Sequence, residues 1–275
     1  MCDMGNARDE GDRILVVDVG NSAIDLGLAR EGVLEAVWKI TTPVRMTADE
    51  ACSAVASLCT WAQAGGPGRA PALDDVSDGV VASVVPHLTD AWVEALSRIA
   101  GRRPLVVGPG VKTGMKMRYN DPGELGADRV ADLVAAKEVC TPPFVVVDLG
   151  TTTNFEVVDA QGVFLGGIIA PGLRLSARAL SDAAAQLADV DVHAPSSVIG
   201  KNTREAMRAG IVAGEVARID GLVDAVWREL GCTTEVVATG EDAAAIAALS
   251  SRIERVEPRL TLRGLALLHG LNRKR

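Results

Sequence analysis

Aromatic residues are scarce in this chain of 275 residues. Phe, Trp and Tyr together make up only 3% of it, and Tyr119 is its one tyrosine. Because 48% of the positions are nevertheless hydrophobic, the core must be built mainly from Val, Leu, Ile and Ala. The length and this apolar content are sufficient for one large domain or for two domains of ordinary size.

Basic runs are also missing. The net charge is −8, and no run of three Lys or Arg residues occurs before positions 273–275. A nucleic-acid groove is therefore not expected, and neither is a nucleic-acid partner. An anionic ligand would have to be held by a local site, made of backbone N–H groups, a few Arg or Lys side chains, or a metal ion.

Cysteine pairs, histidine clusters and long apolar runs are absent as well. The five cysteines include no C-x-x-C pair and the three histidines are scattered, which favours free thiols in a reducing cytosol over a disulfide framework or a zinc site. No stretch approaches the ~18 consecutive apolar residues of a membrane span, and residues 1–13 are too polar for a signal peptide. We expect a cytoplasmic protein with no membrane partner and a flexible N-terminal tail over residues 1–13.

One sequence pattern occurs twice. Residues 14–33 and 144–163 each contain an apolar run that ends in Asp-x-Gly followed by Asn or Thr. Asp18 and Gly20 of the first copy recur as Asp148 and Gly150 of the second. Each run has the composition of a buried strand, and the glycine ends it.

Strands and helices are predicted in a similar order after both copies. The repetition predicts an α/β fold with two similar domains, over residues 14–118 and 119–275. A single α/β domain is the alternative, because spaced glycines arise easily by chance.

The two Asp-x-Gly turns have a chemistry that suits a phosphate. Glycine lets another molecule approach the backbone N–H groups, and Asn21 or Thr151 adds side-chain donors. A carboxylate at the strand end would repel phosphate unless a divalent cation lay between them, and Mg²⁺ accepts carboxylate and phosphate oxygens together. The two turns could hold a nucleoside triphosphate with Mg²⁺; the alternative is that both are ordinary hairpins.

A third carboxylate, Asp128, lies at the predicted start of a helix, beside Arg129. In one interpretation Asp128 is an N-cap whose oxygens bind free helix N–H groups. In the other it is a base that takes a proton from an attacking hydroxyl, while Arg129 and the helix N-terminus hold an anionic substrate. Composition does not choose between the two.

Small residues form two further groups with open interpretations. Gly166 and Gly167 allow a close approach of either a ligand or another backbone segment. Four small residues at helical spacing favour a packing face against another helix, in the same subunit or a second one: Ala206, Gly210, Ala213 and Gly214.

With these motifs in order, the chain resembles the type III pantothenate kinases, a family of the acetate and sugar kinase/Hsp70/actin superfold. The matching motifs are DVGNS, SVVP, VGPGVKTG, YNDPGELGADR, DLGTTT, GGIIAPG, GKNT and TLRGL, between about residues 14 and 272. GADR after Y-x-x-P, between the two Asp-x-Gly motifs, is a specific combination, whereas either Asp-x-Gly motif alone is weak.

The resemblance implies a fold, an activity and partners. The fold would be two similar actin/ribonuclease-H-like domains facing across a nucleotide cleft. The activity would be transfer of the ATP γ-phosphate to the primary hydroxyl of pantothenate, giving 4'-phosphopantothenate in the first step of coenzyme A biosynthesis. The protein would work as a homodimer, with Mg²⁺ and a monovalent cation, K⁺ or NH₄⁺, as cofactors.

The resemblance also implies a role for individual residues. Asp128 would accept the proton, Asp18 would lie near Mg²⁺ and Asp148 would bind K⁺ or NH₄⁺. ATP would be bound by Thr151 and the first loop, which consists of Asp18, Val19, Gly20, Asn21, Ser22, Ala23, Ile24 and Asp25. Pantothenate would be bound by Tyr119, Gly126, Ala127, Asp128, Arg129 and Thr203.

The chain departs from the family pattern at three relevant positions. The second loop commonly reads D-F-G-T-A-T-T-F-D, but this chain has Asn154 and Glu156 in that segment. The late strand commonly ends in T-G-G, but here Glu241 takes the place of the last glycine. Glu241 and Asn154 motivate one alternative, a non-catalytic relative that binds nucleotide, pantothenate or a partner protein. Another alternative is a kinase for a different small hydroxy acid or sugar.

Overall fold

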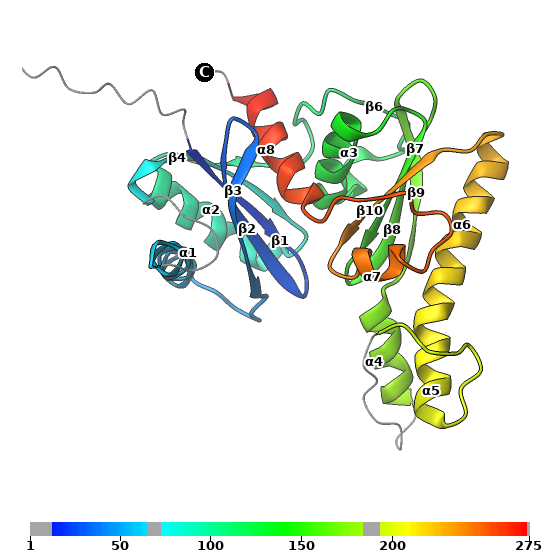
Figure 1. Ribbon diagram of the computed structural model, residues 1–275. Helices are drawn as coiled ribbons and strands as arrows, with labels where there is room; N and C mark the ends of the chain where they lie inside the picture. Colours follow the sequence, from blue (N-terminus) through cyan, green and yellow to red (C-terminus); the bar gives the residue numbers. More distant parts are fainter. Residues whose placement is uncertain (1–12, 65–72, 184–192, 274–275) are drawn as a thin grey trace, which may run out of the picture. The chain divides into compact units, whose positions relative to one another are not determined.

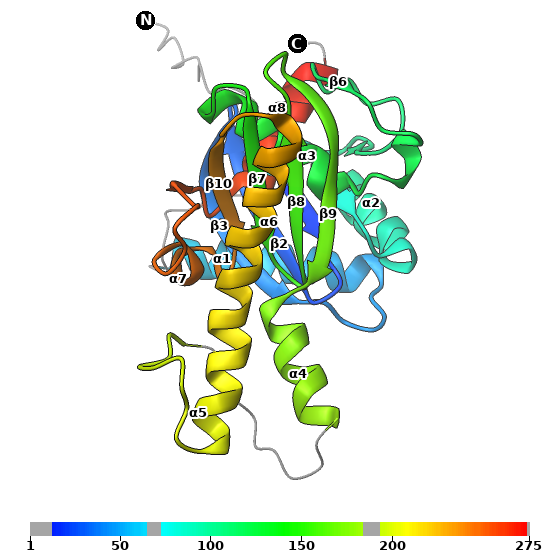
Figure 2. The ribbon, with the colours of Figure 1, turned by 90° about the vertical axis from the view of Figure 1, so that its right-hand side faces the viewer.

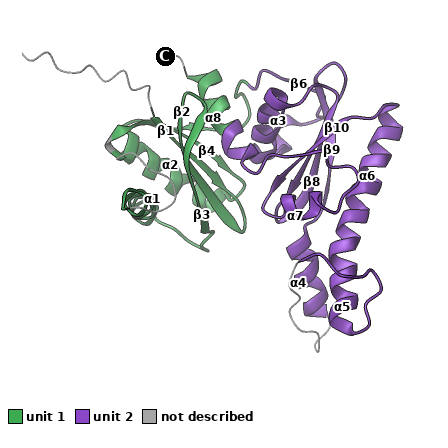
Figure 3. Ribbon diagram, in the orientation of Figure 1, with its two compact units in different colours: residues 1–112, 265–275 green, residues 113–264 purple. Residues whose placement is uncertain are grey.

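The computed structural model describes most of the chain, namely residues 13–64, 73–183 and 193–273 (Figure 1). The predicted N-terminal tail, apart from Arg13, lies outside the described residues. The chain divides into two compact units (Figure 3). Unit 1 is Met1–Lys112 with Leu265–Arg275, and unit 2 is Thr113–Gly264.

Unit 1 contains a five-stranded sheet in the order β3-β2-β1-β4-β5. The strands are β1 (Arg13–Val19), β2 (Ala23–Arg30), β3 (Val33–Thr41), β4 (Val76–Ser83) and β5 (Leu105–Val106). Its helices are α1 (Ala48–Gln63), α2 (Pro86–Ala100) and a 3₁₀ turn (Leu73–Asp75). Apolar residues of α1 and α2 share one core with β1, β2 and β3, as the apolar spacing of those segments predicts.

The ends of α1 and α2 follow from local sequence. Thr47 and Glu50 form a capping box, because each side chain accepts a hydrogen bond from the backbone N–H of the other, over 3.2 and 2.7 Å. Pro86 occupies the first turn of α2, where its missing N–H costs nothing. Gly101 ends α2 in the left-handed conformation that glycine adopts freely.

Unit 2 contains a six-stranded sheet in the order β11-β10-β7-β8-β9-β6. The strands are β6 (Lys116–Met117), β7 (Phe144–Leu149), β8 (Thr152–Val158), β9 (Val163–Pro171), β10 (Glu235–Gly240) and β11 (Arg255–Val256). Helices within this unit are α3 (Ala127–Val139), α4 (Leu173–Ala183), α5 (Thr203–Arg208), α6 (Gly214–Leu230), α7 (Ala243–Ala247), a 3₁₀ turn (Pro122–Glu124) and a π-helical segment (Ala209–Ala213). Figure 1 shows α3 and α6 on opposite faces of the sheet.

The two sheets repeat one topology. In unit 1, β1 pairs antiparallel with β2 and parallel with β4, and β2 pairs antiparallel with β3. In unit 2, β7 pairs in the same way with β8 and β10, and β8 pairs antiparallel with β9. The duplicated Asp-x-Gly runs are thus the equivalent strands β1 and β7, and the predicted α/β fold with two similar halves is confirmed.

The closing helix, α8 (Leu260–Asn272), belongs to both units. The sequence interpretation assigned all of 119–275 to one domain, but from Leu265 onward the helix belongs to unit 1. There His269 Nε2 lies 3.0 Å from Asp78 Oδ2 on β4. An apolar helical pattern predicts a helix but does not specify which sheet will bury it, so the pattern could not predict this division.

Helices α4, α5 and α6, with the π-helical segment, form what we call the helical arm of unit 2. Figure 2 shows the continuous rod from α5 to α6 extending beyond the end of the sheet, with α4 beside its outer half. Leu173 and Ala177 of α4 are buried in the same core cluster as Met207 and Ile211 of the rod. Among the residues that the structure describes, no helix has the length and apolar character needed to cross a membrane.

Candidate active site

The first Asp-x-Gly turn joins β1 to β2 in unit 1. The Gly20 N–H donates to the Ala23 carbonyl over 3.0 Å, and the Thr42 hydroxyl donates to the Gly20 carbonyl over 2.6 Å. A Cβ at Gly20 would lie 2.9 Å from the Ala23 oxygen, so the tight turn requires glycine. Asn21 and Ser22 are exposed at its tip. The turn is a hairpin, and its polar tip is open to a ligand.

The second turn joins β7 to β8 in unit 2 and is approached closely by two other segments. A Cβ at Gly172 would lie 2.4 Å from the Gly150 oxygen, and a Cβ at Gly240 would lie 2.4 Å from the Leu149 oxygen. Gly240 also has a φ of 96°, which favours glycine. Thr151 remains exposed. The ends of β9 and β10 therefore converge on the turn that the sequence assigns to the nucleotide.

Polar side chains gather on one face of the unit 2 sheet. In the register of the sheet, Asp148 lies opposite both Asn154 and Thr239, and Glu156 lies opposite both Val146 and Gly167. Directly opposed residues point to the same face of a sheet. Val145, Val147 and Leu149 point to the other face, into the core that contains α6. The polar residues therefore lie on the face that α3 covers.

Asp128 lies in the first turn of α3 but is not its N-cap. The N-cap is Gly126, which makes no side-chain hydrogen bond. Asp128 is two residues further on, partly exposed, and its Oδ1 accepts the Arg129 N–H over 2.8 Å. The N-cap interpretation of Asp128 is therefore wrong, because the helix begins one residue before this side chain.

Arg129 and Glu156 form a buried ion pair. Arg129 Nε donates to Glu156 Oε1 over 2.6 Å, and the two side chains are 6% and 0% exposed. Burial raises the pKa of Glu156 to about 7, although the charge and hydrogen bond of Arg129 oppose this rise. Burial would lower the pKa of Arg129, but Glu156 and, less strongly, Tyr119 raise it overall. Arg129 thus remains a cation at the centre of the site.

Asp132 lies one helical turn after Asp128 and is fully buried. Its Oδ1 accepts the Thr261 hydroxyl over 2.7 Å, and its Oδ2 has no hydrogen-bond partner among the described residues. Burial raises the pKa of Asp132 well above its usual value, and the nearby charges of Asp148, Glu156 and Asp128 raise it further. Three neighbouring carboxyl groups therefore act on Asp132, and one of them, Glu156, is paired with Arg129.

A pocket of about 500 Å³ opens beside this cluster within unit 2. Its lining includes Tyr119 and Asn120 from the β6–α3 loop, Gly166 and Gly167 from β9, and Val226 from α6. The volume falls in the ordinary range for small-molecule sites, which is roughly 300–1,000 Å³.

Tyr119 and Gly167 connect this pocket to the buried ion pair. The Tyr119 ring stacks on Phe164 with its centroid 5.6 Å away. A Cβ at Gly167 would lie 2.6 Å from Arg129 Nη2, so glycine leaves the room that the guanidinium occupies. The pocket wall therefore lies directly against Arg129.

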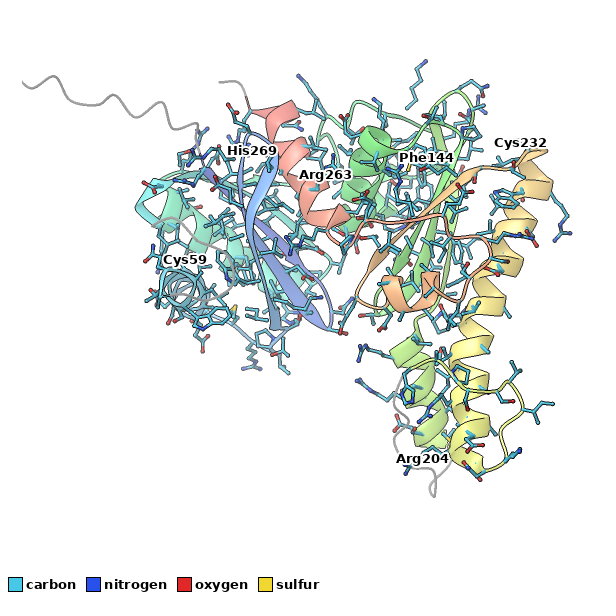
Figure 4. All side chains as sticks on the ribbon, viewed as in Figure 1. Cys59, Phe144, Arg204, Cys232, Arg263 and His269 are labelled. Carbon is cyan, nitrogen blue, oxygen red and sulfur yellow. The ribbon has the colours of Figure 1, made fainter. Side chains whose placement is uncertain are left out.

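Thr203 is not brought to this pocket within one chain. It is exposed at the outer end of the helical arm, next to Arg204, which is labelled in Figure 4. Val226 of the same rod lines the pocket. The 23 residues between Thr203 and Val226 span about 35 Å at the helical rise. The other predicted pantothenate residues, Tyr119 and 126–129, lie together at the start of α3 and in the loop before it.

Glu241, the departure from T-G-G, is held by an ion pair. Arg174 Nη2 at the start of α4 lies 3.0 Å from Glu241 Oε1 and 3.2 Å from Asp242 Oδ1. Arg174 follows Gly172, and Glu241 follows Gly240, so the pair joins the two segments that pack on the second turn. Both Arg174 and Glu241 are more than half exposed.

Sequence reasoning missed the roles of Glu156 and Asp132. The sequence identifies Glu156 only as a departure from the family pattern. A lone carboxylate inside the otherwise apolar β8 nevertheless indicates a buried partner. Asp132 lies four residues after Asp128, a spacing that places both on one helix face. That spacing was the available signal.

A family model described as Type III pantothenate kinase matches residues 14–225. A type III pantothenate kinase of Moorella thermoacetica is 39% identical over 259 residues, covering 94% of this chain and 99% of the relative. One from Anaeromyxobacter dehalogenans is 42% identical over 260 residues, covering 94% and 100%.

Among solved structures, the ethanolamine utilization protein EutJ from Carboxydothermus hydrogenoformans superposes with a TM-score of 0.53. The match covers 92% of this chain and 89% of EutJ, at 19% sequence identity. At that identity the likeness concerns the fold alone.

Proposed function

Since the chain belongs to the type III pantothenate kinase family and phosphorylates pantothenate with ATP in coenzyme A biosynthesis, we propose that the residues around the start of α3 carry this reaction. The observation that supports the proposal most is that Asp128 and Arg129 are adjacent at the start of α3 and that Arg129 Nη2 lies next to Gly167, a residue of the pocket wall. The alternative of a non-catalytic binding protein gains no support from the comparisons.

Asp128 is the proposed base. Its carboxylate is partly exposed, and only one of its oxygens is committed to the Arg129 N–H. The primary hydroxyl of pantothenate would lose its proton to the other oxygen as it attacks the γ-phosphorus, and ADP would leave. Phosphoryl transfer depends mainly on positioning and on neutralising charge, so one base and a well-placed hydroxyl are sufficient from the acceptor side.

Pantothenate itself would occupy the pocket along β9, which Tyr119 and Gly167 help to line. Gly126 and Ala127 at the start of α3 would lie at its reacting end, and Arg129, which lies next to Gly167, would supply the cation for its carboxylate. Arg129 Nε is taken by Glu156, so the remaining N–H groups of the guanidinium would bind the substrate. A second copy of the chain would supply Thr203.

ATP and its cations would be held by the two Asp-x-Gly turns. Family membership establishes a need for a divalent cation, and we propose Mg²⁺ beside Asp18, with residues 18–25 and Thr151 binding ATP. No group of three or more His, Cys, Asp or Glu residues suits a metal ion within the described part of the chain. This fits Mg²⁺ held by one carboxylate together with phosphate oxygens, where the ion would neutralise charge. Asp148 would hold the monovalent cation, K⁺ or NH₄⁺.

A homodimer would complete the substrate site. The helical arm carries exposed apolar side chains, with Leu175 and Leu180 of α4 both 41% exposed. Added Cβ atoms at Gly210 and Gly214 would meet nothing within 4 Å, so the small-residue face of the rod is uncovered in one chain. A second copy packed on the arm would bury these surfaces and bring its Thr203 to the pocket.

One assay tests the proposal. Purified protein is mixed with ATP, Mg²⁺ and pantothenate, with and without K⁺, and 4'-phosphopantothenate is measured. We expect product whose rate rises with K⁺ and does not rise with an equal concentration of a tetraalkylammonium salt. Absence of product under both conditions, from protein with an intact folding transition, would contradict the assignment of this site.

A further inference from the structure

The Arg129 guanidinium and the Glu156 carboxylate could form two parallel hydrogen bonds, but they form only one. Nε and Oε1 are joined over 2.6 Å, but Arg129 Nη2 and Glu156 Oε2 have no hydrogen-bond partner among the described residues. An arginine and a carboxylate that served only each other would normally make two parallel bonds. The exposed pair of Arg252 and Asp224 in the same unit does so, over 2.7 and 3.3 Å.

The single contact determines how the guanidinium is oriented. Because Nε donates a hydrogen bond to Glu156, the guanidinium group is fixed on its Nε side. Gly167, directly opposite Glu156 in the sheet, lies against Nη2 and leaves no room on that side for a larger residue. Gly167 lines the pocket and is itself exposed. The unsatisfied Nη2 donor is itself buried and therefore lies next to Gly167, one residue of the pocket wall.

A buried donor without an acceptor destabilises the folded protein. The cost is relieved if an anionic ligand in the pocket supplies the missing acceptor. Pantothenate has one carboxylate. Of the two arginines that could meet it, Arg118 lines the pocket but is exposed, whereas Arg129 is buried next to Gly167 of the pocket wall. The bond that the ion pair lacks is thus one that the substrate can make.

We propose that Glu156 is a positioning residue that holds Arg129 in the orientation in which its Nη2 binds the carboxylate of pantothenate. This inference rests on the proposed function, and it adds a residue to which neither the family motif nor the comparisons assign a role. Glu156 acts through Arg129 and does not itself contact the substrate.

The test compares two ligands across three variants. The ligands are pantothenate and its alcohol analogue, in which –CH₂OH replaces the carboxylate; binding is measured by calorimetry, and KM and kcat by product formation. Glu156→Leu fills a similar volume but cannot accept the Nε–H. We expect it to weaken pantothenate binding and raise KM about tenfold or more, with kcat changed far less and binding of the alcohol unchanged.

Glu156→Gln provides the conservative rescue, because its amide oxygen can still accept the Nε–H. We expect its KM for pantothenate to stay within about threefold of wild type. Asp224→Asn, in the exposed Arg252 pair, is the matched control and should leave both ligands unaffected. If Glu156→Leu does not fold, Glu156→Met, which has a similar volume and no carboxylate, takes its place with the same expected loss for pantothenate alone.

Two results would overturn the proposal. One is equal weakening of pantothenate and the alcohol, which would mean that Glu156 has only a structural role. The other is unchanged pantothenate binding in Glu156→Leu or Glu156→Met. Failure of the proposed function is distinguishable, because wild-type protein would then form no product whatever the calorimetry shows.

Discussion

The Thr261 hydroxyl donates a hydrogen bond to Asp132 Oδ1 over 2.7 Å and so joins α8 to α3, although the two residues are 129 positions apart. The same pair of helices is in close contact one turn further along. There a Cβ at Gly264 would lie 1.9 Å from the Ala131 carbonyl oxygen. Helix α3, which carries Asp128, therefore packs directly against α8.

Substitution of Gly264 by alanine should destabilise the protein, because the added methyl group overlaps backbone that cannot move as a flexible side chain would. We expect a loss of about 1–3 kcal/mol in the free energy of unfolding, measured by urea denaturation. Gly270→Ala on the same helix is the control, because a Cβ there meets nothing within 4 Å. Alanine at that position should stabilise by about 0.5–1 kcal/mol. Equal effects at the two positions would disprove the close helix contact.

Replacement of Asp128 by asparagine should leave the fold intact and reduce kcat. Asparagine keeps the size and the acceptor for the Arg129 N–H, but its amide cannot take the proton of the pantothenate hydroxyl. We expect a loss of about 10²–10⁴-fold in kcat, with little change in KM and in the thermal midpoint. Near wild-type turnover by this variant would show that another group accepts the proton.

The buried Glu156 should make stability depend on pH. Its pKa rises from 4.5 to about 7 on folding, so between these values the native state binds more protons than the unfolded state. The contribution of Glu156 to the free energy of unfolding is therefore fully present below pH 4.5, and it is lost as pH rises through 7. Glu156→Gln has no ionisable group at this position and does not lose this contribution. The difference in unfolding free energy between Glu156→Gln and wild type should therefore shift in favour of the variant by up to about 3 kcal/mol between pH 5 and 8.

Urea denaturation at several pH values measures this difference, and Asp224→Asn serves as the control with a constant offset. Glu156 is one of the groups that raise the pKa of Asp132, so the difference between Glu156→Gln and wild type reports the two carboxyl groups together. A difference between Glu156→Gln and wild type that does not vary with pH would mean that Glu156 is charged throughout this range.

Glu241 should weaken ATP binding, because its carboxylate lies beside the turn proposed to hold an anionic ligand. We expect Glu241→Gly to lower KM for ATP about 3- to 10-fold with kcat unchanged. Glu241→Gln separates the causes, since it removes the charge but keeps the side chain. An equal decrease in KM for ATP in both variants would identify the charge of Glu241 as the cause. A decrease in Glu241→Gly alone would show that the side chain keeps ATP from the backbone. A rise in KM for both variants would instead make Glu241 a favourable contact.

Much of the fold could be predicted because it depends on local patterns. Apolar runs and glycines specify β1, β7 and their turns, and Thr47 with Glu50 specifies the start of α1. The position of Asp128 near a helix start was predictable for the same reason. Contacts that depend on the register of the strands could not be predicted. The Arg129–Glu156 pair arises only when β8, β9 and α3 are assembled, and no local pattern encodes which sheet receives the second half of α8.

Tyr119 has a consequence for experiment that goes beyond its place in the pocket wall. It is the one tyrosine of the chain and its ring is stacked on Phe164. Every tyrosine signal in the near-ultraviolet spectrum therefore originates at a single point, beside Arg129 and the entering ligand. Because the four tryptophans absorb in the same range, the difference between the spectra of the wild-type protein and Tyr119→Phe isolates this signal, and its change on adding ligand reports occupancy of the pocket without any label.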